Sequence, residues 1–167
     1  MSSNELVDLV DNNGLVVRTA IPRAEAEKLN GEDLHIPIIG CVILNSSGEV
    51  LVHERATGKR FEGCLDHVYG AILSGESPQA AATRECSEEL GIKPEISTLV
   101  REGINAYNYY QYLFAVITND QPQNFSKGEV AWAKYMRPDQ LKAGHDTREY
   151  LFTHNFFEDL EAVLSHE

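Results

Sequence analysis

The segment that most constrains the fold of this chain is a helix whose two ends are both marked in the sequence. Ser77 is a good capping residue because its hydroxyl can accept a hydrogen bond from the first helical turn, and Pro78 suits the first helical position. The alanines at 80–82 favour the helix interior, and Gly91 follows Leu90 as a stop. These signals agree, and they predict a helix over 78–90.

The predicted helix carries three carboxylates on one side. A helix turns by about 100° per residue, so Glu85, Glu88 and Glu89 fall within an arc of roughly 100°. Like charges at this spacing each cost roughly a few tenths of a kcal/mol, whereas a divalent cation removes the conflict. Mg²⁺ and Mn²⁺ prefer carboxylate oxygens and keep waters for a phosphorylated substrate. From the glutamates alone, a solvated acidic face explains the pattern equally well.

The longer spacing around the helix favours the metal. It runs Gly70, five residues, Glu76, seven residues, Arg84-Glu85, two residues, Glu88-Glu89, one residue, Gly91 and an apolar residue. Over residues 70–92 this resembles the signature box of the Nudix hydrolases at every fixed position. Cys86 is a mild departure, since the family usually has Ile, Leu or Val there, and a buried cysteine behaves as a small hydrophobic residue.

The resemblance implies a role for each acidic position of the helix. Glu85, Glu88 and Glu89 match the family's metal ligands, and the Gly70 carbonyl often joins them. Glu85 or Glu88 is expected to orient or deprotonate the attacking water. Arg84 is expected to hold Glu88 or Glu76 by a charge-assisted hydrogen bond, and its alternative is a surface ion pair.

Other positions in and near the box have both a structural and a catalytic interpretation. Gly70 and Gly75 allow the backbone to turn closely around a metal and a phosphate, and Gly91 ends the helix. Glu76 either supports catalysis or only stabilises the helix start through the helix dipole. Glu129, just before a predicted strand, lies where many family members place an additional catalytic or metal-binding carboxylate, although a solvated strand-edge residue is the simpler interpretation.

The family's chemistry is hydrolysis of a nucleoside or other organic diphosphate linked to a further group. The resemblance therefore implies a Mg²⁺-dependent pyrophosphohydrolase, with Mn²⁺ as an alternative metal, that acts on a small organic di- or triphosphate. Clustered carboxylates rather than a nucleophile triad serve this reaction, because metal ions neutralise the phosphate oxygens while a water attacks phosphorus.

Sequence outside the box resembles the branch of the family that contains type I isopentenyl-diphosphate isomerase and its hydrolase relatives. The resemblance rests on the N-terminal hairpin and on residues 34–36, 55–59 and 64–70. In that branch, the residues matching Arg55 and Lys59 bind the substrate diphosphate. The alternative is that this basic cluster only adds solubilising charge to a loop.

Two positions argue against the isomerase reaction itself. That reaction needs a cysteine at the position of Tyr69 and a metal-binding histidine at that of Ala71, whereas His35 does match one metal histidine of the isomerase. A tyrosine with a pKa near 10 is a poor replacement for a thiol, and alanine cannot ligate a metal. Hydrolysis is therefore favoured, with an isomerase-like enzyme and a non-catalytic Nudix ligand-binding module as the alternatives.

Composition excludes several other classes of function. The 14 lysines and arginines against 26 acidic residues give a formal net charge of −12, which argues against nucleic acid and anionic lipid as partners. No apolar run reaches the roughly 18 residues of a membrane span, and the N-terminus lacks the features of a signal peptide. Three irregularly spaced cysteines, Cys41, Cys64 and Cys86, indicate neither a disulfide framework nor a zinc site, so we expect a cytoplasmic protein.

The remaining segments predict a mixed sheet with helices. Expected strands pair as hairpins over 6–20, around the Asn-Gly of residues 13–14, and over 36–52, followed by strands near 67–69, 96–103, 110–118 and 130–136. Expected helical segments cover 22–29, a brief turn from 138 that ends before Gly144, and 147–164, the last able to pack on the sheet or join a partner. His53, His67, His145, His154 and His166 show no metal spacing, and we expect them to be ordinary polar residues.

Together with the resemblance, these segments predict one domain over 1–167, an α/β fold of the Nudix-type α/β/α sandwich. Residues 1–35 form an N-terminal hairpin and short helix extension, and residues 70–92 form the box. A homodimer is common among relatives.

Overall fold

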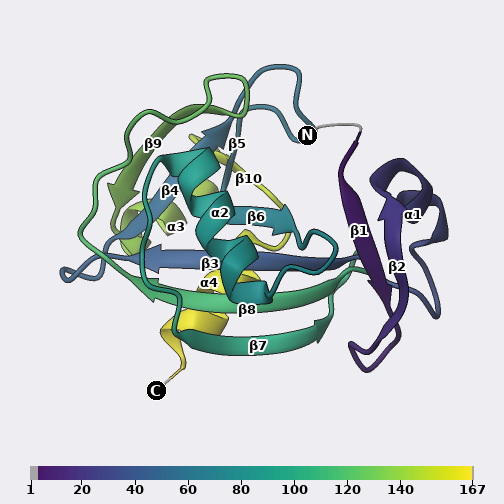
Figure 1. The fold of residues 1–167 in the computed structure, drawn as a ribbon. Helices are drawn as coiled ribbons and strands as arrows, with labels where there is room; N and C mark the ends of the chain where they lie inside the picture. The colour runs from purple at the N-terminus through teal and green to yellow at the C-terminus, as the bar shows by residue number, and fades with distance from the viewer. Residues whose placement is uncertain (1–3, 167) are drawn as a thin grey trace.

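The structure, a computed structural model, describes residues 4–166, and its centre is a mixed sheet of eight strands (Figure 1). The strand order is β10-β5-β4-β3-β8-β7, with β6 paired to β3 and β9 paired to β4. The β3–β8 and β10–β5 pairs are parallel and the others are antiparallel. The strands are β3 (Pro37–Leu44), β4 (Val50–Arg55), β5 (Cys64–Asp66), β6 (Val68–Ala71), β7 (Thr98–Ile104), β8 (Tyr110–Ile117), β9 (Val130–Met136) and β10 (Leu151–Phe152).

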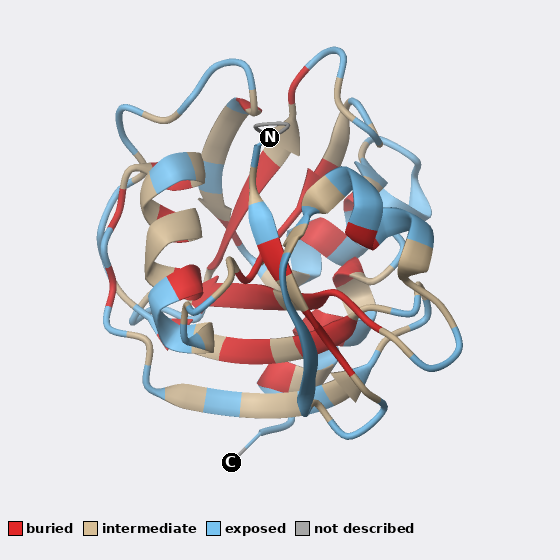
Figure 2. Ribbon diagram, turned by 45° about the vertical axis from the view of Figure 1, so that its right-hand side comes forward, coloured by how far each residue is buried: buried red, intermediate tan, exposed pale blue. Residues whose placement is uncertain are grey.

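Helices cover both faces of this sheet because the central strands are apolar on both sides. Ile39, Cys41 and Ile43 of β3 belong to the core under α2 (Pro78–Leu90), whereas Val42 between them belongs to the opposite core. The opposite core includes residues of α3 (Pro138–Asp146) and α4 (Phe156–Leu164). Figure 2 shows the buried residues gathered along the central strands. The predicted α/β/α sandwich is confirmed.

An N-terminal extension is attached to one edge of the sandwich. It consists of the antiparallel hairpin β1 (Leu6–Val10) and β2 (Val16–Pro22), followed by α1 (Arg23–Leu29), as predicted. Bridges from Val7 to Leu73 and from Val10 to His35 join β1 to the main body. Asp8 adds side-chain contacts, since its carboxylate accepts hydrogen bonds from the Ser74 hydroxyl at 2.6 Å and from the Gly75 amide at 3.4 Å. The extension is thereby fastened to the loop that precedes α2.

Two short strands replace the single one expected near 67–69. β5 pairs with β4, β6 pairs with β3, and His67 lies at the change of partner. The sequence does not show this division, because a strand's choice of neighbour leaves no mark on the local pattern of residues.

The predicted C-terminal segments are also corrected. α3 continues through Gly144 to Asp146, because Gly144 is buried closely against the ring of Tyr150. The helix expected over 147–164 begins only at Phe156, because residues 151–152 form β10 alongside β5 and the Thr153 hydroxyl donates a hydrogen bond to Asp66. Phe156, Leu160 and Val163 then bury the apolar side of α4 on the sheet.

Candidate active site

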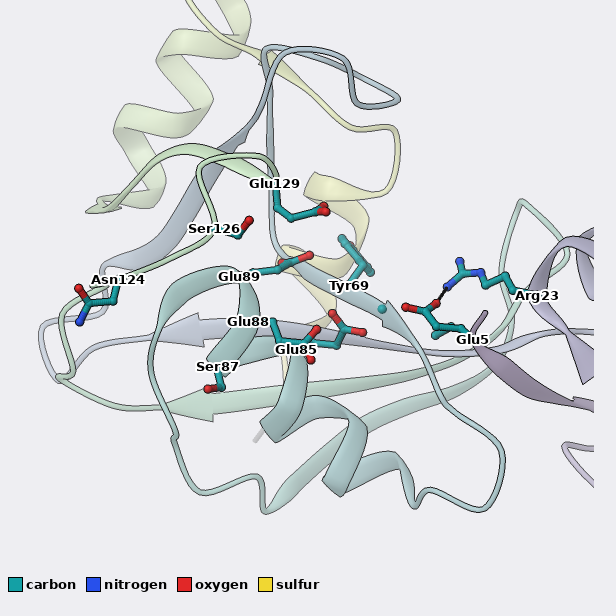
Figure 3. Close-up of a pocket in the computed structure, with 12 residues that line it drawn as sticks. Glu5, Arg23, Tyr69, Glu85, Ser87, Glu88, Glu89, Asn124, Ser126 and Glu129 are labelled. Carbon is teal, nitrogen blue, oxygen red and sulfur yellow. Dashed lines mark hydrogen bonds and ion pairs between the residues drawn. The ribbon is translucent and has the colours of Figure 1, made fainter. Parts of the chain in front are cut away.

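Helix α2 presents its glutamates to a cavity of about 510 Å³, which we call the carboxylate cavity. The Ser77 hydroxyl accepts a hydrogen bond from the Ala80 amide at 3.2 Å, and Gly91 ends the helix in the left-handed conformation at φ 66°, as predicted. Ala81, Ala82, Cys86 and Leu90 anchor α2 in the core. Figure 3 shows the acidic side chains that line this cavity: Glu5, Glu85, Glu88, Glu89 and Glu129.

The three glutamates share one helix face but differ in environment. The Glu85 and Glu89 side chains are each 14% exposed, whereas that of Glu88 is 60% exposed. Burial, followed by the charges of Glu85 and Asp66, raises the pKa of Glu89 well above its usual value. Burial also raises the pKa of Glu85, against the opposing effect of Arg84. The charge of Arg55 also acts on Glu89, but it does not offset the effect of burial.

Arg84 connects the box residues to one another. Its Nε and Nη2 donate to the two carboxylate oxygens of Glu76 at 3.0 Å each, and Nη2 also donates to the Ala71 carbonyl at 2.9 Å. Nη1 donates to Glu85 at 2.6 Å and lies 3.5 Å from a Glu88 oxygen. The sequence led us to expect contact with Glu88 or Glu76; the structure has both, and adds Glu85.

Glu76 and the box glycines lie around the site rather than inside the cavity. Glu76 accepts a hydrogen bond from the Leu73 amide at 3.0 Å and also accepts the hydrogen bonds from Arg84. It therefore joins the loop before α2 to the helix. Gly75 adopts φ 80° in that loop. Gly70 lies directly beside Glu85, so that a methyl group added at Gly70 would collide with the Glu85 carboxyl group.

The basic residues outside the box have carboxylate partners. Lys59 forms an ion pair with Glu129, and Arg55 donates to Asp66 at 3.1 Å. Although partial burial opposes it, the Lys59 contact lowers the pKa of Glu129. Arg55 and Glu129 both line a cavity of about 140 Å³ that shares Gly70 and Glu89 with the carboxylate cavity. The structure thus brings all the residues predicted for metal, catalysis and diphosphate into one region.

The donor set fits a divalent cation, although within residues 4–166 no three acidic, cysteine or histidine side chains converge on a common point as they stand. Glu89 Oε2 is buried and has no hydrogen-bond partner among these residues. Carboxylate oxygens on one helix face, with the Gly70 backbone close by, are the hard donors that Mg²⁺ and Mn²⁺ prefer. Arg84 supplies the counter-charge between Glu85 and Glu88, and a cation would supply it at Glu89.

Two histidines expected to be ordinary polar residues are buried instead. His53 lies beneath the site with Nε2 3.9 Å from Glu89 Oε2, and burial lowers its pKa to about 3. His67 is enclosed between the sheet and α4. His53 follows Val52 and His67 follows Asp66. Neither histidine has the spacing of a metal site, so the sequence gives no signal that either one would be buried. His35 is structural, since its ring nitrogens contact the Asn108 carbonyl and the Asn12 side chain at 2.6 Å each.

Tyr69 lines the cavity but its hydroxyl is already engaged. The Oη atom donates to buried Asp159 at 2.6 Å. Burial and the neighbouring carboxylates raise the pKa of Tyr69 well above its usual value. Gln111 donates to the same Asp159 oxygen at 2.8 Å, so this polar group joins β6, β8 and α4.

The family assignment follows from comparison with known proteins. The NUDIX domain model matches residues 34–156, the greater part of the chain. The chain therefore belongs to the Nudix hydrolase family, consistent with a hydrolase acting on phosphorus-containing anhydrides, and its fold and box agree with that assignment. Nudix hydrolases generally use divalent metal ions, and the family acts on small organic diphosphates.

Similar proteins cover most of the chain. An uncharacterised Nudix hydrolase of Listeria monocytogenes is 31% identical over 95% of this chain and 96% of its own length. An isopentenyl-diphosphate Delta-isomerase of Streptomyces coelicolor is 30% identical over 84% of this chain and 75% of its own length. The crystal structure of DR0079 from Deinococcus radiodurans shares the fold, with a TM-score of 0.75, 20% identity, and coverage of 95% of this chain and 99% of that one.

None of the helices in residues 4–166 is both long enough and apolar enough to cross a membrane.

Proposed function

We propose that this protein is a Mg²⁺-dependent pyrophosphohydrolase that cleaves a phosphoanhydride bond of a small organic di- or triphosphate, nucleotides included. Mn²⁺ is expected to replace Mg²⁺. The observation that carries the proposal is the carboxylate cluster on α2: buried Glu85 and Glu89 and exposed Glu88 face a cavity, and Glu89 Oε2 lacks a partner among the described residues.

In this proposal, the position of each box residue determines its role. Glu85, Glu88 and Glu89, with the Gly70 carbonyl, would hold the metal, which when bound neutralises phosphate oxygens and lowers the pKa of water. Glu88 has the exposure needed to accept a proton from an attacking water at the cavity mouth. Arg84 and Glu76 would fix the direction of Glu85 and Glu88 through the hydrogen bonds described above.

Diphosphate binding is assigned to the basic residues on the other side of the cavity. Arg55 is the last residue of β4 and Lys59 lies in the loop that follows, and each is paired with a carboxylate that lies near the cavities. A bound diphosphate would compete for these pairs, because a guanidinium or ammonium group binds phosphate oxygens at least as well as a single carboxylate. Glu129, released from Lys59, could then act as the additional carboxylate.

The decisive experiment measures turnover together with metal binding. Purified protein with Mg²⁺ is incubated with nucleoside di- and triphosphates, nucleotide sugars, dinucleotides and isopentenyl diphosphate, and product masses are recorded. We expect Glu88→Gln to lower kcat by at least about 100-fold, and the exposed control Glu161→Gln on α4 to leave it unchanged. Mg²⁺ should raise the Tm of the wild type by roughly 5 °C and that of Glu88→Gln by less. No turnover of any compound, with retained binding, would favour a ligand-binding module instead.

An isomerase-like enzyme is the second candidate, because the relative in Streptomyces coelicolor carries that name. The contacts of Tyr69 weigh against it: the hydroxyl is tied to Asp159, and Ala71 offers no ligand. Conversion of isopentenyl diphosphate without a change of mass would establish this candidate, whereas release of phosphate or pyrophosphate would exclude it.

We also assign the protein to the cytoplasm. Cys41, Cys64 and Cys86 are all free thiols in the structure, and reducing compartments keep thiols in that form.

A further inference from the structure

A second large cavity lies beside the carboxylate cavity and has a different chemistry. It measures about 360 Å³, and five of the residues in its wall carry aromatic rings: Phe61, Tyr69, Tyr107, Tyr109 and His154. The His154 ring stands edge-on to Phe61 and Tyr107, with centroids 5.6 and 6.1 Å away. We call this space the ring cavity. Its aromatic wall suits an organic group, whereas the carboxylate cavity suits a metal and phosphates.

Arg23 stands at the boundary between the two spaces. Within residues 4–166, Arg23 and Tyr69 are the two residues that line the carboxylate cavity, the ring cavity and the smaller cavity that shares residues with both. Arg23 is the first residue of α1, in the N-terminal extension, and so lies outside the region matched by the NUDIX domain model. Figure 3 shows its side chain reaching toward Glu5 at the edge of the carboxylate cavity.

The guanidinium group of Arg23 is only loosely held by protein. Its Nη1 lies 3.5 Å from Glu5 and its Nε 3.3 Å from Glu27, both near the upper limit for a hydrogen bond. Its Nη2 has no hydrogen-bond or ion-pair partner among the described residues. The side chain is 17% exposed, so an arginine fork with unused donor capacity is partly shielded from water next to an acidic cavity.

We propose that Arg23 of the N-terminal extension binds a phosphate of the substrate, and that the organic group of the same molecule occupies the ring cavity. The proposal rests on the proposed function and names the orientation of its substrate. Phosphates next to Glu85 and Glu89 need positive charge on the side away from the metal, and Arg23 supplies it from the extension. The extension is then part of the substrate site as well as an addition to the fold.

The test separates the phosphate contact from the ring contact by using two probes. Calorimetry measures binding of imidodiphosphate, a hydrolysis-resistant diphosphate without an organic group, in the presence of Mg²⁺. We expect Arg23→Gln to weaken this binding about tenfold and Arg23→Lys to weaken it less. The matched control Arg18→Gln, on the exposed strand of the same extension, should bind as the wild type does. Phe61→Ala should leave imidodiphosphate binding unchanged, because it removes only a ring.

Kinetics with the hydrolysed substrate completes the test. Arg23→Gln and Phe61→Ala should each raise KM about tenfold while kcat changes much less. If Arg23 only ties α1 to Glu5, Arg23→Gln will lower Tm and leave imidodiphosphate affinity unchanged, and the phosphate contact is then refuted. If Phe61→Ala leaves KM unchanged, the ring-cavity assignment is refuted. Absence of turnover in the wild type would refute the proposed hydrolase, while the calorimetry would still decide the role of Arg23.

Discussion

At the scale of single residues, the acidic positions of α2 differ more than their spacing suggests. Glu85 and Glu89 are mostly buried and Glu88 is mostly exposed, although all three lie on one helix face. Arg84 balances the charges of Glu76 and Glu85, whereas Glu89 Oε2 has no hydrogen-bond partner among residues 4–166. These environments support the different tasks proposed for the three side chains, since a buried carboxylate can retain a metal whereas an exposed one can exchange protons with water.

The contact between Gly70 and Glu85 leads to the first prediction at this scale. In Gly70→Ala, the new methyl group would displace the Glu85 carboxyl group and disturb its hydrogen bond with Arg84. We expect kcat to fall by at least about 10-fold, because misplacement of about 1 Å at a reacting site is costly. The control is Gly31→Ala, where an added Cβ meets nothing within 4 Å. Steady-state kinetics and thermal unfolding measure both variants, and equal activities would refute the close fit.

At the scale of elements, α2 depends on how its ends are joined to the rest of the molecule. Its start is held by Ser77 and by the loop fastened to Asp8 of the extension. Two backbone hydrogen bonds hold its end: the Gly91 N–H donates to the Ser87 carbonyl, and the backbone N–H of Gln123 donates to the Leu90 carbonyl. The segment from Gln123 therefore holds the C-terminal end of the helix in place as well as connecting strands.

The prediction at this scale compares two glycines with similar backbone angles. Gly91 (φ 66°) and Gly48 (φ 76°) both have left-handed backbone conformations. Replacing either with alanine should lower the free energy of unfolding by about 1 kcal/mol, because alanine is strained in that conformation. A methyl group at Gly91 would also strike the Gln123 carbonyl, whereas one at Gly48 meets nothing within 4 Å. We expect Gly91→Ala to cost at least about 2 kcal/mol more than Gly48→Ala in urea unfolding. Equal losses of stability in the two variants would show that the segment at Gln123 moves away from the new methyl group at no energetic cost.

At the scale of the whole molecule, buried polar groups as well as apolar ones join the central sheet to α4. His67 lies between β5 and β6 and stacks on Phe156 of α4, with ring centroids 4.1 Å apart. Its Nε2 donates to the Phe156 carbonyl at 3.1 Å, and burial lowers its pKa to about 4. The neighbouring Asp66 is buried as well, which raises its pKa to about 6. Global stability therefore depends on pH through groups that lie beneath the site.

His67 predicts a loss of stability in mild acid. Below pH 6.5 the unfolded chain takes up a proton at this histidine, whereas the folded chain does so only near pH 4, so the free energy of unfolding falls as pH falls through that window. Asp66 opposes the trend, because between pH 6 and 3.8 the folded state binds the extra proton. The contribution of His67 is therefore measured as the difference between the wild type and His67→Gln.

Urea unfolding at pH 7.5 and pH 5 gives that difference. We expect the stability advantage of the wild type over His67→Gln to shrink by about 2 kcal/mol between these values. An advantage that stays constant would contradict a neutral buried imidazole at this position.

The sequence by itself determined what depends on local chemistry and spacing. The caps at Ser77 and Gly91, the turn at Asn13-Gly14, and the face shared by Tyr112, Phe114 and Val116 were all predicted and are confirmed, because capping, turn geometry and side-chain periodicity act over a few residues. The family followed from the spacing of the box and is confirmed by the domain match.

Only the tertiary structure decided which distant segments meet. It split the strand near His67, shortened the last helix to Phe156–Leu164, buried His53 beneath Glu89, and brought Arg23 to the edge of the carboxylate cavity. The physical reason is the same in each case: strand partners, burial and the water-free neighbourhood of a charge are set by segments far away in the chain, and local periodicity carries no record of them.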